Sequence, residues 1–339
     1  MGSKVTIYEV AKAAGVGIGT VSRVLNNNAS VTPETRERVK EVMKQLNFQP
    51  HTYAQRLARN QSETISAIIP FFTNYFFVEV LRGVQEGLGR LGYDLTLFGV
   101  NDIEQVEPKI VRALQRGRFD GILFFSMRLP DRIVPRLKEA SIPMVLVDAF
   151  YPKFDSISVA NTDGAYDATT HLISIGHRKV GMVNALQRSA PAAERLQGYR
   201  RALESNGINY SEELVKTGVS ARQDGFNRDA GYEAMVDFIR MGKEMPHAFF
   251  VSSDIQAIGA MAALSENGFR VPEDVSIVGF DDIELARHFK LTTMRQPMYQ
   301  MGQMAVERLA ARMSDSVLEV VHTTFIPELI VRDTTRPFS

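Results

Sequence analysis

The chain has 339 residues and no cysteine, which excludes disulfide bonds and thiolate chemistry. Its 39 Lys and Arg equal its 39 Asp and Glu, but residues 1–60 hold nine basic and four acidic side chains, whereas residues 61–339 hold 30 and 35. Because basic surface supplies the phosphate-binding part of nucleic-acid affinity, a head of net charge +5 on an acidic remainder favours a DNA-binding protein.

The first predicted elements are two short helices joined by a tight turn. Thr6 and Glu9 have the spacing of a capping box, and Gly15 is a typical helix end. The second helix is predicted from Gly17 to about Leu25. The apolar residues at helical spacing in this pair are Ile7, Val10, Ala11, Ala14, Val21, Val24 and Leu25. This pattern indicates a helix-turn-helix motif, whose second helix enters the major groove of DNA.

A third helix is predicted to begin at Thr32, because Thr32 is an N-cap residue and Pro33 fits the first helical position. Three helices with a solvated basic face could also form a plain bundle, an alternative that the charge distribution disfavours. The glycines within residues 15–19 resemble a dinucleotide-binding loop. Such a loop follows a strand, whereas a capped helix precedes this one, so a nucleotide site is disfavoured here.

Residues 61–339 are long enough for more than one domain, and apolar runs alternate there with amphipathic helical stretches. The predicted strands are Ile65–Phe71, Asp94–Gly99, Gly121–Phe125, Met144–Val147, Val180–Asn184, Ala248–Ser252 and Ser276–Gly279. The predicted helices are roughly 75–91, 104–116, 131–140, 162–175, 191–206, 226–240, 254–267 and 299–313. This alternation predicts an α/β fold with two doubly wound parallel sheets, divided near residues 160–162.

The head segments TIYEVAKAAGV, TVSRVLN, VTPETRERV and MKQLNFQPHTYAQRLA resemble the lactose-repressor family of bacterial transcription regulators. FDGILFF, ISIGHRKVGMV, ERLQGYRRAL and VPEDVSIVGFDDI extend the resemblance through the whole chain. The resemblance implies a helix-turn-helix domain at 1–50, a hinge helix or linker at 51–62, and an effector-binding and dimerisation domain at 63–339. That domain is expected to resemble type I periplasmic binding proteins, with an N-subdomain of about 63–160 plus 291–320 and a C-subdomain of about 161–290 plus 321–339.

The resemblance also implies how the head would bind DNA. The implied contact residues are Thr6, Tyr8, Ile18, Gly19, Thr20, Ser22, Arg23, Asn26, Tyr53, Ala54 and Leu57. Arg23 suits guanine, because a guanidinium can bond both acceptors on the groove edge of that base, whereas Ile18 offers only apolar contact. Gly17 and Gly19 depart from the family pattern, which usually has a polar cap at the first position and a longer side chain at the second.

In this family, a segment like residues 51–59 becomes a short helix on DNA, and two copies enter the minor groove at the operator centre. Leu57 matches the apolar wedge that opens a base step, and Ala54 lies on the same predicted face. The unstacking that a wedge causes is offset by the contacts that the bent DNA permits. A plain amphipathic linker is the alternative.

Ligands of parallel sheets bind beyond the carboxyl ends of the strands, so polar and aromatic residues at those ends are the candidates for the effector site. By resemblance, Asp281 is the effector-binding acid, which can accept hydrogen bonds from two sugar hydroxyls, and Arg195 reaches into the cleft. Phe76 and Phe226 would stack on a flat ligand face, although aromatic residues at strand ends also serve as core. The further candidates are Asp148, Ser253 and Gln296. Asp254, as a helix cap, and Asp282 are expected to be structural.

The donor and acceptor types favour a sugar or sugar phosphate as the effector. Purine-binding members of the family carry an Arg and a Thr where this chain has Ser189 and Pro191, which weakens a nucleobase effector, although Arg188 is adjacent. The segment TTMRQPMYQMG resembles the catabolite-control branch, whose partner is a phosphorylated carrier protein. A protein co-effector and a nucleobase therefore stay as alternatives.

No catalytic or metal site is predicted. The six histidines lack metal-ligand spacing, and no nucleophile-elbow or phosphate-cradling motif is present. No secretion signal and no apolar run of about 18 residues are found, which predicts a cytoplasmic protein without a membrane partner. The family resemblance implies that it is bacterial and nucleoid-associated. We expect a repressor that works as a homodimer on a pseudo-palindromic operator, needs no cofactor and responds to a small-molecule effector. A sugar-binding protein with no role on DNA, or a sugar-processing enzyme, is the alternative outside this class.

Overall fold

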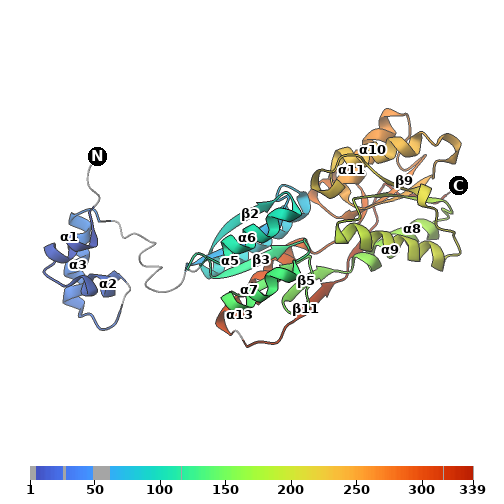
Figure 1. The fold of residues 1–339 in the computed structure, drawn as a ribbon. Coiled ribbons are helices and arrows are strands. Elements are labelled where there is room, and N and C mark those ends of the chain that lie inside the picture. The colour runs from blue at the N-terminus through green and yellow to red at the C-terminus, as the bar shows by residue number, and fades with distance from the viewer. Residues whose placement is uncertain (1–4, 26–27, 49–61, 116, 316, 339) are drawn as a thin grey trace. The chain divides into compact units, whose positions relative to one another are not determined.

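The computed structural model describes residues 5–25, 28–48, 62–115, 117–315 and 317–338. The chain divides into two compact units, which we describe separately (Figure 1). One unit comprises residues 1–64 and 115–120 and contains the N-terminal helices, and the other comprises residues 65–114 and 121–339.

The N-terminal helices are α1 (Ile7–Ala13), α2 (Ile18–Leu25) and α3 (Pro33–Gln45). The predicted capping box forms, because the backbone N–H of Thr6 donates to the Glu9 carboxylate over 2.7 Å. Gly15 takes a left-handed conformation with φ of 65° and ends the first helix, as its lack of a side chain allows. The core of this unit consists of Val10, Ala11, Ala14, Val21, Val24, Val31 and Val39. The predicted three-helix pattern is therefore confirmed.

Two six-stranded sheets form the α/β part of the described chain. The first has the order β11-β5-β4-β3-β1-β2, and the second has the order β12-β10-β9-β8-β6-β7. The strands of the first sheet are β1 (Thr64–Pro70), β2 (Asp94–Val100), β3 (Gly121–Phe125), β4 (Met144–Val147), β5 (Asp155–Val159) and β11 (His322–Phe325). Those of the second are β6 (Val180–Asn184), β7 (Val215–Thr217), β8 (Ala248–Val251), β9 (Ser276–Asp281), β10 (Thr292–Arg295) and β12 (Glu328–Ile330). We call each sheet with its covering helices a lobe.

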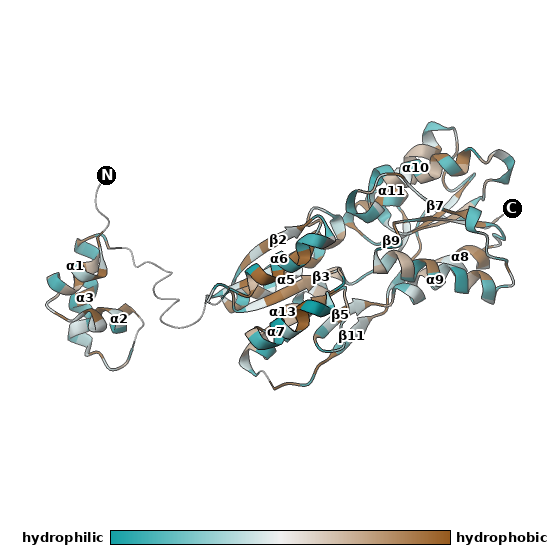
Figure 2. Ribbon diagram, in the orientation of Figure 1, coloured by the Kyte–Doolittle hydropathy of each residue, from teal (hydrophilic) through white to brown (hydrophobic). Residues whose placement is uncertain are grey.

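Neighbouring strands run parallel from β1 through β3, β4 and β5 to β11, and from β6 through β8 and β9 to β10. The short edge strand β12 pairs antiparallel with β10. Apolar residues gather on the strands and on the helix faces turned toward them (Figure 2), as a sheet covered on both sides requires. The predicted α/β class with two parallel sheets is confirmed.

The helices of the α/β part are α5 (Tyr75–Leu91), α6 (Val106–Ala113), α7 (Val134–Ala140), α8 (Asn161–Ser174), α9 (Ala190–Ser205), α10 (Arg228–Ile239), α11 (Asp254–Glu266), α12 (Glu284–His288) and α13 (Met298–Ser314). Short 3-10 turns lie at Ile103–Gln105, Asp131–Ile133, Glu212–Leu214, Arg222–Gly225 and Gly242–Glu244. In the first lobe α5 packs on α13, and in the second α8 packs on α9 and α10 on α11.

Glycines set how closely these helix pairs approach each other. A Cβ added to Gly83 of α5 would lie 2.1 Å from the carbonyl oxygen of Tyr299 in α13, and one added to Gly302 would lie 2.1 Å from that of Val80. The same backbone contact occurs at Gly198, Gly231 and Gly259 in the other two pairs. Any residue with a Cβ would fit at these helix crossings only if one of the two helices moved away.

The crossovers between the lobes lie about five residues later than the predicted boundaries at 291 and 321. The β10 strand belongs to the second sheet and β11 to the first, so α13 and β11 together complete the first lobe. The polar sequence at 292–293 looks like a connection, but both threonines are buried. The Thr293 hydroxyl donates to Asp254 over 2.5 Å, and the Thr292 hydroxyl accepts from the backbone of Arg332. Apart from these two boundaries, the domain limits stay a prediction.

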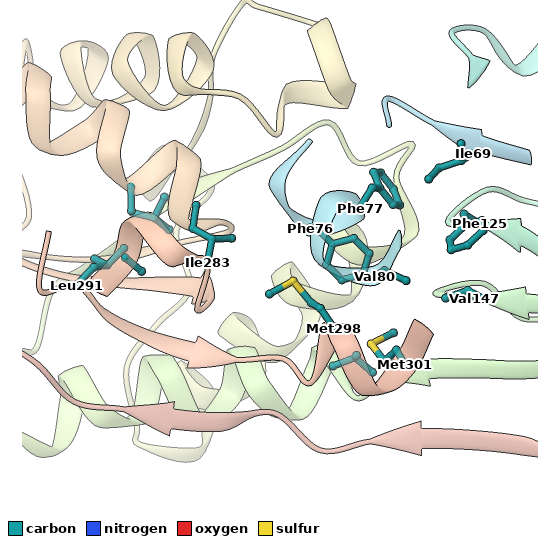
Figure 3. Close-up of a cluster of buried hydrophobic side chains, with 14 of the residues drawn as sticks. Ile69, Phe76, Phe77, Val80, Phe125, Val147, Ile283, Leu291, Met298 and Met301 are labelled. Carbon is teal, nitrogen blue, oxygen red and sulfur yellow. The ribbon is translucent and has the colours of Figure 1, made fainter. Parts of the chain in front are cut away.

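One buried apolar cluster contains residues of both lobes. Phe76 and Val80 of α5 lie near Met298 and Met301 of α13 in this cluster, which also includes Ile283 of the second lobe (Figure 3). The first turn of α5 is thus fixed by packing, and this turn forms part of the candidate site.

Candidate functional site

A cavity with about 60 Å³ of space for the centres of water-sized molecules lies between the two lobes. Six of the seven predicted effector residues line it: Phe76, Asp148, Arg195, Phe226, Ser253 and Asp281. The first two come from the first lobe and the other four from the second. These residues are far apart in the chain, and the carboxyl ends of the two sheets bring them together. We call this space the inner cavity.

Four residues at strand ends turn the chain sharply where it meets the inner cavity. Phe71, Ser126 and Asp148 directly follow β1, β3 and β4, and their φ angles are 47°, 44° and 52°. Asp281, the last residue of β9, has a φ of 126°. Such backbone conformations cost about 1–3 kcal/mol for residues other than glycine and cluster at functional sites.

Arg195 is held in place by the protein itself. Its Nε donates to the side-chain oxygen of Asn161 over 2.9 Å, and its Nη1 donates to the carbonyl oxygen of Ser252. The guanidinium lies 3.8 Å from the ring centroid of Phe280. The same Nη1 lies 3.8 Å from an Asp281 carboxylate oxygen, and both side chains are buried. Arg195 is therefore oriented before any ligand arrives.

Burial changes the proton affinity of the two acids in the inner cavity. It raises the pKa of Asp281 to about 7, against the opposing effects of Arg195 and of a hydrogen bond from Gln296. It raises the pKa of Asp148 to about 6, although the Ser126 hydroxyl donates to that carboxylate over 2.6 Å. Near neutral pH these carboxyls can both donate and accept hydrogen bonds, which matches the chemistry of a hydroxyl group.

Gln296 does not line the inner cavity. It lies buried behind Asp281, and its Nε2 donates to Asp281 Oδ1 over 2.6 Å. Its Oε1 is buried without a hydrogen-bond partner among the described residues. Gln296 therefore orients the Asp281 carboxylate, and its expected contact with the effector stays a prediction. The position follows from β10, which ends at Arg295 beside β9.

Ser253 lines the cavity, but its hydroxyl is occupied as the N-cap of α11. It accepts from the backbone N–H of Gln256 and donates to the side-chain oxygen of the same residue. The expected helix cap, Asp254, instead accepts hydrogen bonds from Thr293 and from the backbone of Ile283. Ser253 therefore caps α11, and Asp254 connects this helix to Thr293 of β10 and to Ile283.

Asp282 has purely structural partners, as expected. It is paired with Arg295 over 2.7 Å and with Arg332 over 2.6 Å, and its side chain is almost fully buried. These pairs join β9 to β10 and to the C-terminal segment, away from the cavity.

Several residues of the site were missed in the sequence, and three of them make side-chain hydrogen bonds there. Ser126 holds Asp148, the Asn74 side chain donates to the carbonyl oxygen of Phe226 over 3.2 Å, and the Gln223 amide donates to the Thr73 hydroxyl over 3.4 Å. The last two bonds join the lobes across the cavity. Ser126 follows a predicted strand and could have been found as a polar residue at a strand end. A hydrogen bond between the lobes, in contrast, has no signature in the local sequence.

The positions at which purine-binding members of the family carry an Arg and a Thr are Ser189 and Pro191 in this chain. Ser189 and Pro191 line the inner cavity at the start of α9. Arg188, the neighbouring candidate, donates to Asp224 over 2.7 Å and lies outside the inner cavity. The side chains at these places therefore bring no free cation into the inner cavity.

The second helix of the head presents an outward face with little side-chain bulk. Ile18 is 41% exposed, Arg23 is exposed, and a Cβ added to Gly19 would meet no atom within 4 Å. The helix begins at Ile18, and the Gly17 carbonyl accepts from the backbone of Thr20 and Val21. Tyr8 and Thr6 are exposed, and Thr20 and Ser22 are half-buried. The predicted contacts Asn26, Tyr53, Ala54 and Leu57 lie outside the described residues.

In the described part of the chain, no helix has the length and apolar character needed to cross a membrane. The same part contains no group of three or more His, Asp or Glu arranged to hold a metal ion.

Known proteins resemble both parts of the chain. Residues 6–51 match the model of bacterial regulatory proteins of the lacI family, and residues 169–335 match a periplasmic binding protein-like domain. The HTH-type transcriptional repressor PurR of Vibrio vulnificus is 35% identical over 336 residues, which cover 98% of both chains.

Solved structures give the same result. The lac repressor dimer bound to operator and the anti-inducer ONPF superposes with a TM-score of 0.84 at 27% identity, over 98% of this chain and 100% of that one. The complex of the transcriptional regulator CelR with cellobiose has a TM-score of 0.72 at 30% identity, with the same coverage. The chain therefore belongs to the lacI family of bacterial regulatory proteins, which are DNA-binding transcription repressors.

Proposed function

We propose that this protein is a homodimeric repressor whose operator affinity is set by a carbohydrate in the inner cavity. One observation carries the proposal. The same chain joins a helix-turn-helix head with an exposed second helix to a two-lobed unit whose inner cavity holds an oriented Arg195 beside Asp281. The related lac repressor was solved as a dimer on operator DNA, which supports the same assembly here.

The chemistry of the inner cavity supports a carbohydrate. Arg195 supplies donors, Asp281 and Asp148 supply donors or acceptors, and Phe76 and Phe226 supply apolar surface. A sugar ring presents hydroxyls at its edge and C–H groups on its faces, so it suits polar groups around aromatic walls. The cellobiose complex of CelR supports this class, and the likeness to PurR favours the nucleobase alternative. Ser189 and Pro191 weigh against a base, because neither side chain can read its edge in the way an Arg can.

We propose that Ile18, Gly19 and Arg23 face the bases and that the hinge at 51–62 inserts Leu57 as a wedge at the operator centre. The remaining contacts proposed are Thr6, Tyr8, Thr20, Ser22, Asn26, Tyr53 and Ala54. The effector acts by a population shift, because a ligand changes an equilibrium only through its different affinity for the two states.

The function proposed involves binding without turnover, in the bacterial cytoplasm where the operator is found. Membership of a family of transcription regulators supports both points. The catabolite-control interpretation, with a phosphorylated protein as co-effector, stays a prediction.

A thermal-shift screen of the full chain against sugars, sugar phosphates and nucleobases tests the effector class. A ligand that binds only the folded state stabilises it by about 2.7 kcal/mol at a hundredfold excess over its Kd. We expect stabilisation by a carbohydrate that is lost in Asp281→Ala. Stabilisation by nucleobases alone would contradict the carbohydrate assignment and support the purine-type alternative.

A further inference from the structure

The inner cavity opens into a second and larger space between the same lobes. The two share seven wall residues, among them Ser126, Asp148 and Asp224. Counting only the space open to the centre of a water molecule, the inner cavity has about 60 Å³ and the second space, which we call the outer cavity, has about 920 Å³. One water needs about 10–15 Å³ on this measure, so the inner cavity has room for roughly four to six waters, about the bulk of one sugar ring, and the outer cavity has room for much more.

An aromatic side chain is exposed in the outer cavity. Phe150 lies two residues after Asp148 on the loop that follows β4, and its side chain is 63% exposed. It contacts the ring of His322 at a centroid distance of 4.8 Å and a tilt of 49°, which leaves most of the phenyl surface uncovered. Asp148 therefore lines both cavities, while Phe150, on the same loop, lines only the outer one.

The walls of both cavities together carry more negative than positive charge. The ionisable side chains are Asp102, Asp148, Asp163, Asp224, Asp281, Glu194, Arg128, Arg188 and Arg195. Six acids thus line the walls with three arginines. The net negative charge is smaller than this count, because Arg201 outside the walls pairs with Asp163 over 2.6 Å and burial raises the pKa of Asp281 to about 7. A phosphorylated ligand would have to overcome this excess of negative charge, whereas a neutral polyhydroxyl ligand would not.

We propose that the effector is a neutral carbohydrate of at least two linked rings. One ring occupies the inner cavity beside Arg195 and Asp281, and the next stacks on Phe150 in the outer cavity, where side chains such as Arg128 and Asn101 supply hydrogen bonds. This inference rests on the proposed carbohydrate effector and adds the length and charge of the ligand. Phe150 is then the residue that determines preference for chain length.

The test is calorimetric titration of the full chain with matched neutral probes: glucose against cellobiose and maltose, galactose against lactose, and fructose against sucrose, with glucose 6-phosphate as the charged probe. We expect one disaccharide to bind at least tenfold more tightly than its own monosaccharide, and glucose 6-phosphate to bind no more tightly than glucose. Phe150→Ala and Phe150→Leu should reduce the disaccharide preference to within threefold while keeping the monosaccharide affinity.

Phe289→Ala is the matched control, because Phe289 is an exposed aromatic residue (46%) that lines neither cavity. It should leave the disaccharide preference unchanged. Binding of a monosaccharide as tight as its disaccharide, or a preference that survives in both Phe150 variants, would overturn the two-ring inference and leave the carbohydrate effector standing. Tighter binding of glucose 6-phosphate than of any neutral probe would overturn the neutral class. Binding of nucleobases with no carbohydrate response would overturn the proposed function and the inference together.

Discussion

Asp281 and Asp148 are aspartates placed where their charge is costly, and they share the cavity with one buried arginine. Removing two carboxylates from water costs more than one Arg195 at 3.8 Å regains, which is why their pKa values rise toward neutrality. Such carboxyl groups lower the stability of the fold above neutral pH. Groups with strongly shifted pKa values are typical of functional sites.

Asp281→Asn should reveal this cost in the pH dependence of stability. The pKa of Asp281 is raised to about 7, whereas an aspartate in the unfolded chain titrates near 3.9, so the native state holds the extra proton between those values. The contribution of this group to stability is therefore present at low pH and is lost as the pH rises to about 7. Asparagine mimics the protonated form, so the variant does not lose this stability as the pH rises. The free energy of unfolding of the variant minus that of the native protein should therefore be roughly 1–4 kcal/mol larger at pH 8 than at pH 5.

Chemical denaturation of the ligand-free chain at the two pH values measures this difference. Asp237→Asn, at a half-exposed position on α10, is the control and should show no such gain. An Asp281→Asn variant with the same pH dependence as the native protein would show that the buried carboxyl titrates normally.

For single residues, the sequence predicted which side chains belong to the site but not the environment of those side chains. Arg195, Asp281 and the two phenylalanines were found because strand ends and family motifs mark them. The pKa shifts depend on burial between two lobes, and the Asn74 and Gln223 bonds depend on residues about 150 positions away. Neither property is encoded in a local pattern.

The helix pairs depend on backbone contact at glycines, which allows a direct comparison within one helix. Gly83 and Gly89 both lie in α5, but only Gly83 faces α13. Gly83→Ala should destabilise the protein by roughly 1–3 kcal/mol, because the new methyl group overlaps the Tyr299 carbonyl. Gly89→Ala meets no atom within 4 Å and should stabilise it by up to about 1 kcal/mol, since alanine favours helix.

Thermal and urea unfolding of the two variants provides the measurement. Equal effects of the two substitutions would mean that α5 and α13 do not approach each other at Gly83. The sequence could not show which glycines lie at helix contacts, because a glycine in a predicted helix can also lie at an exposed position where it merely lowers helix stability.

Long apolar strands and capped helices were predictable, and short edge strands were not. The strands β7, β11 and β12 have three or four residues and are partly exposed, so their hydrophobic pattern is too weak to recognise. The β5 and β10 strands are rich in Ser and Thr, whose buried hydroxyls are satisfied by partners elsewhere in the chain. This is why the crossover boundaries were displaced and why β5 and β10, although interior to their sheets, were missed. The short helix α12 was also missed. The strands and helices that were predicted occur in the predicted order.

At the scale of the whole molecule, function requires that the inner cavity control a head elsewhere in the chain. Among the described residues, hydrogen bonds from Asn74 to Phe226 (3.2 Å) and from Gln223 to Thr73 (3.4 Å) span the cavity, and one buried apolar cluster contains residues of both lobes. A bound ligand adds contacts to both lobes and so favours one arrangement of them over others. Couplings of this kind amount to about 1–3 kcal/mol, or 5–150-fold in affinity.

The central claim is that ligand in the cavity changes operator affinity. We would select an operator from a random pool of duplex DNA and measure its Kd for the full chain by fluorescence anisotropy, at one fixed salt concentration because salt alone changes such affinities. The carbohydrate identified by calorimetry should change this Kd at least fivefold at saturation, and Asp281→Ala should bind operator without responding. An operator Kd that stays constant while calorimetry shows the cavity saturated would contradict the account.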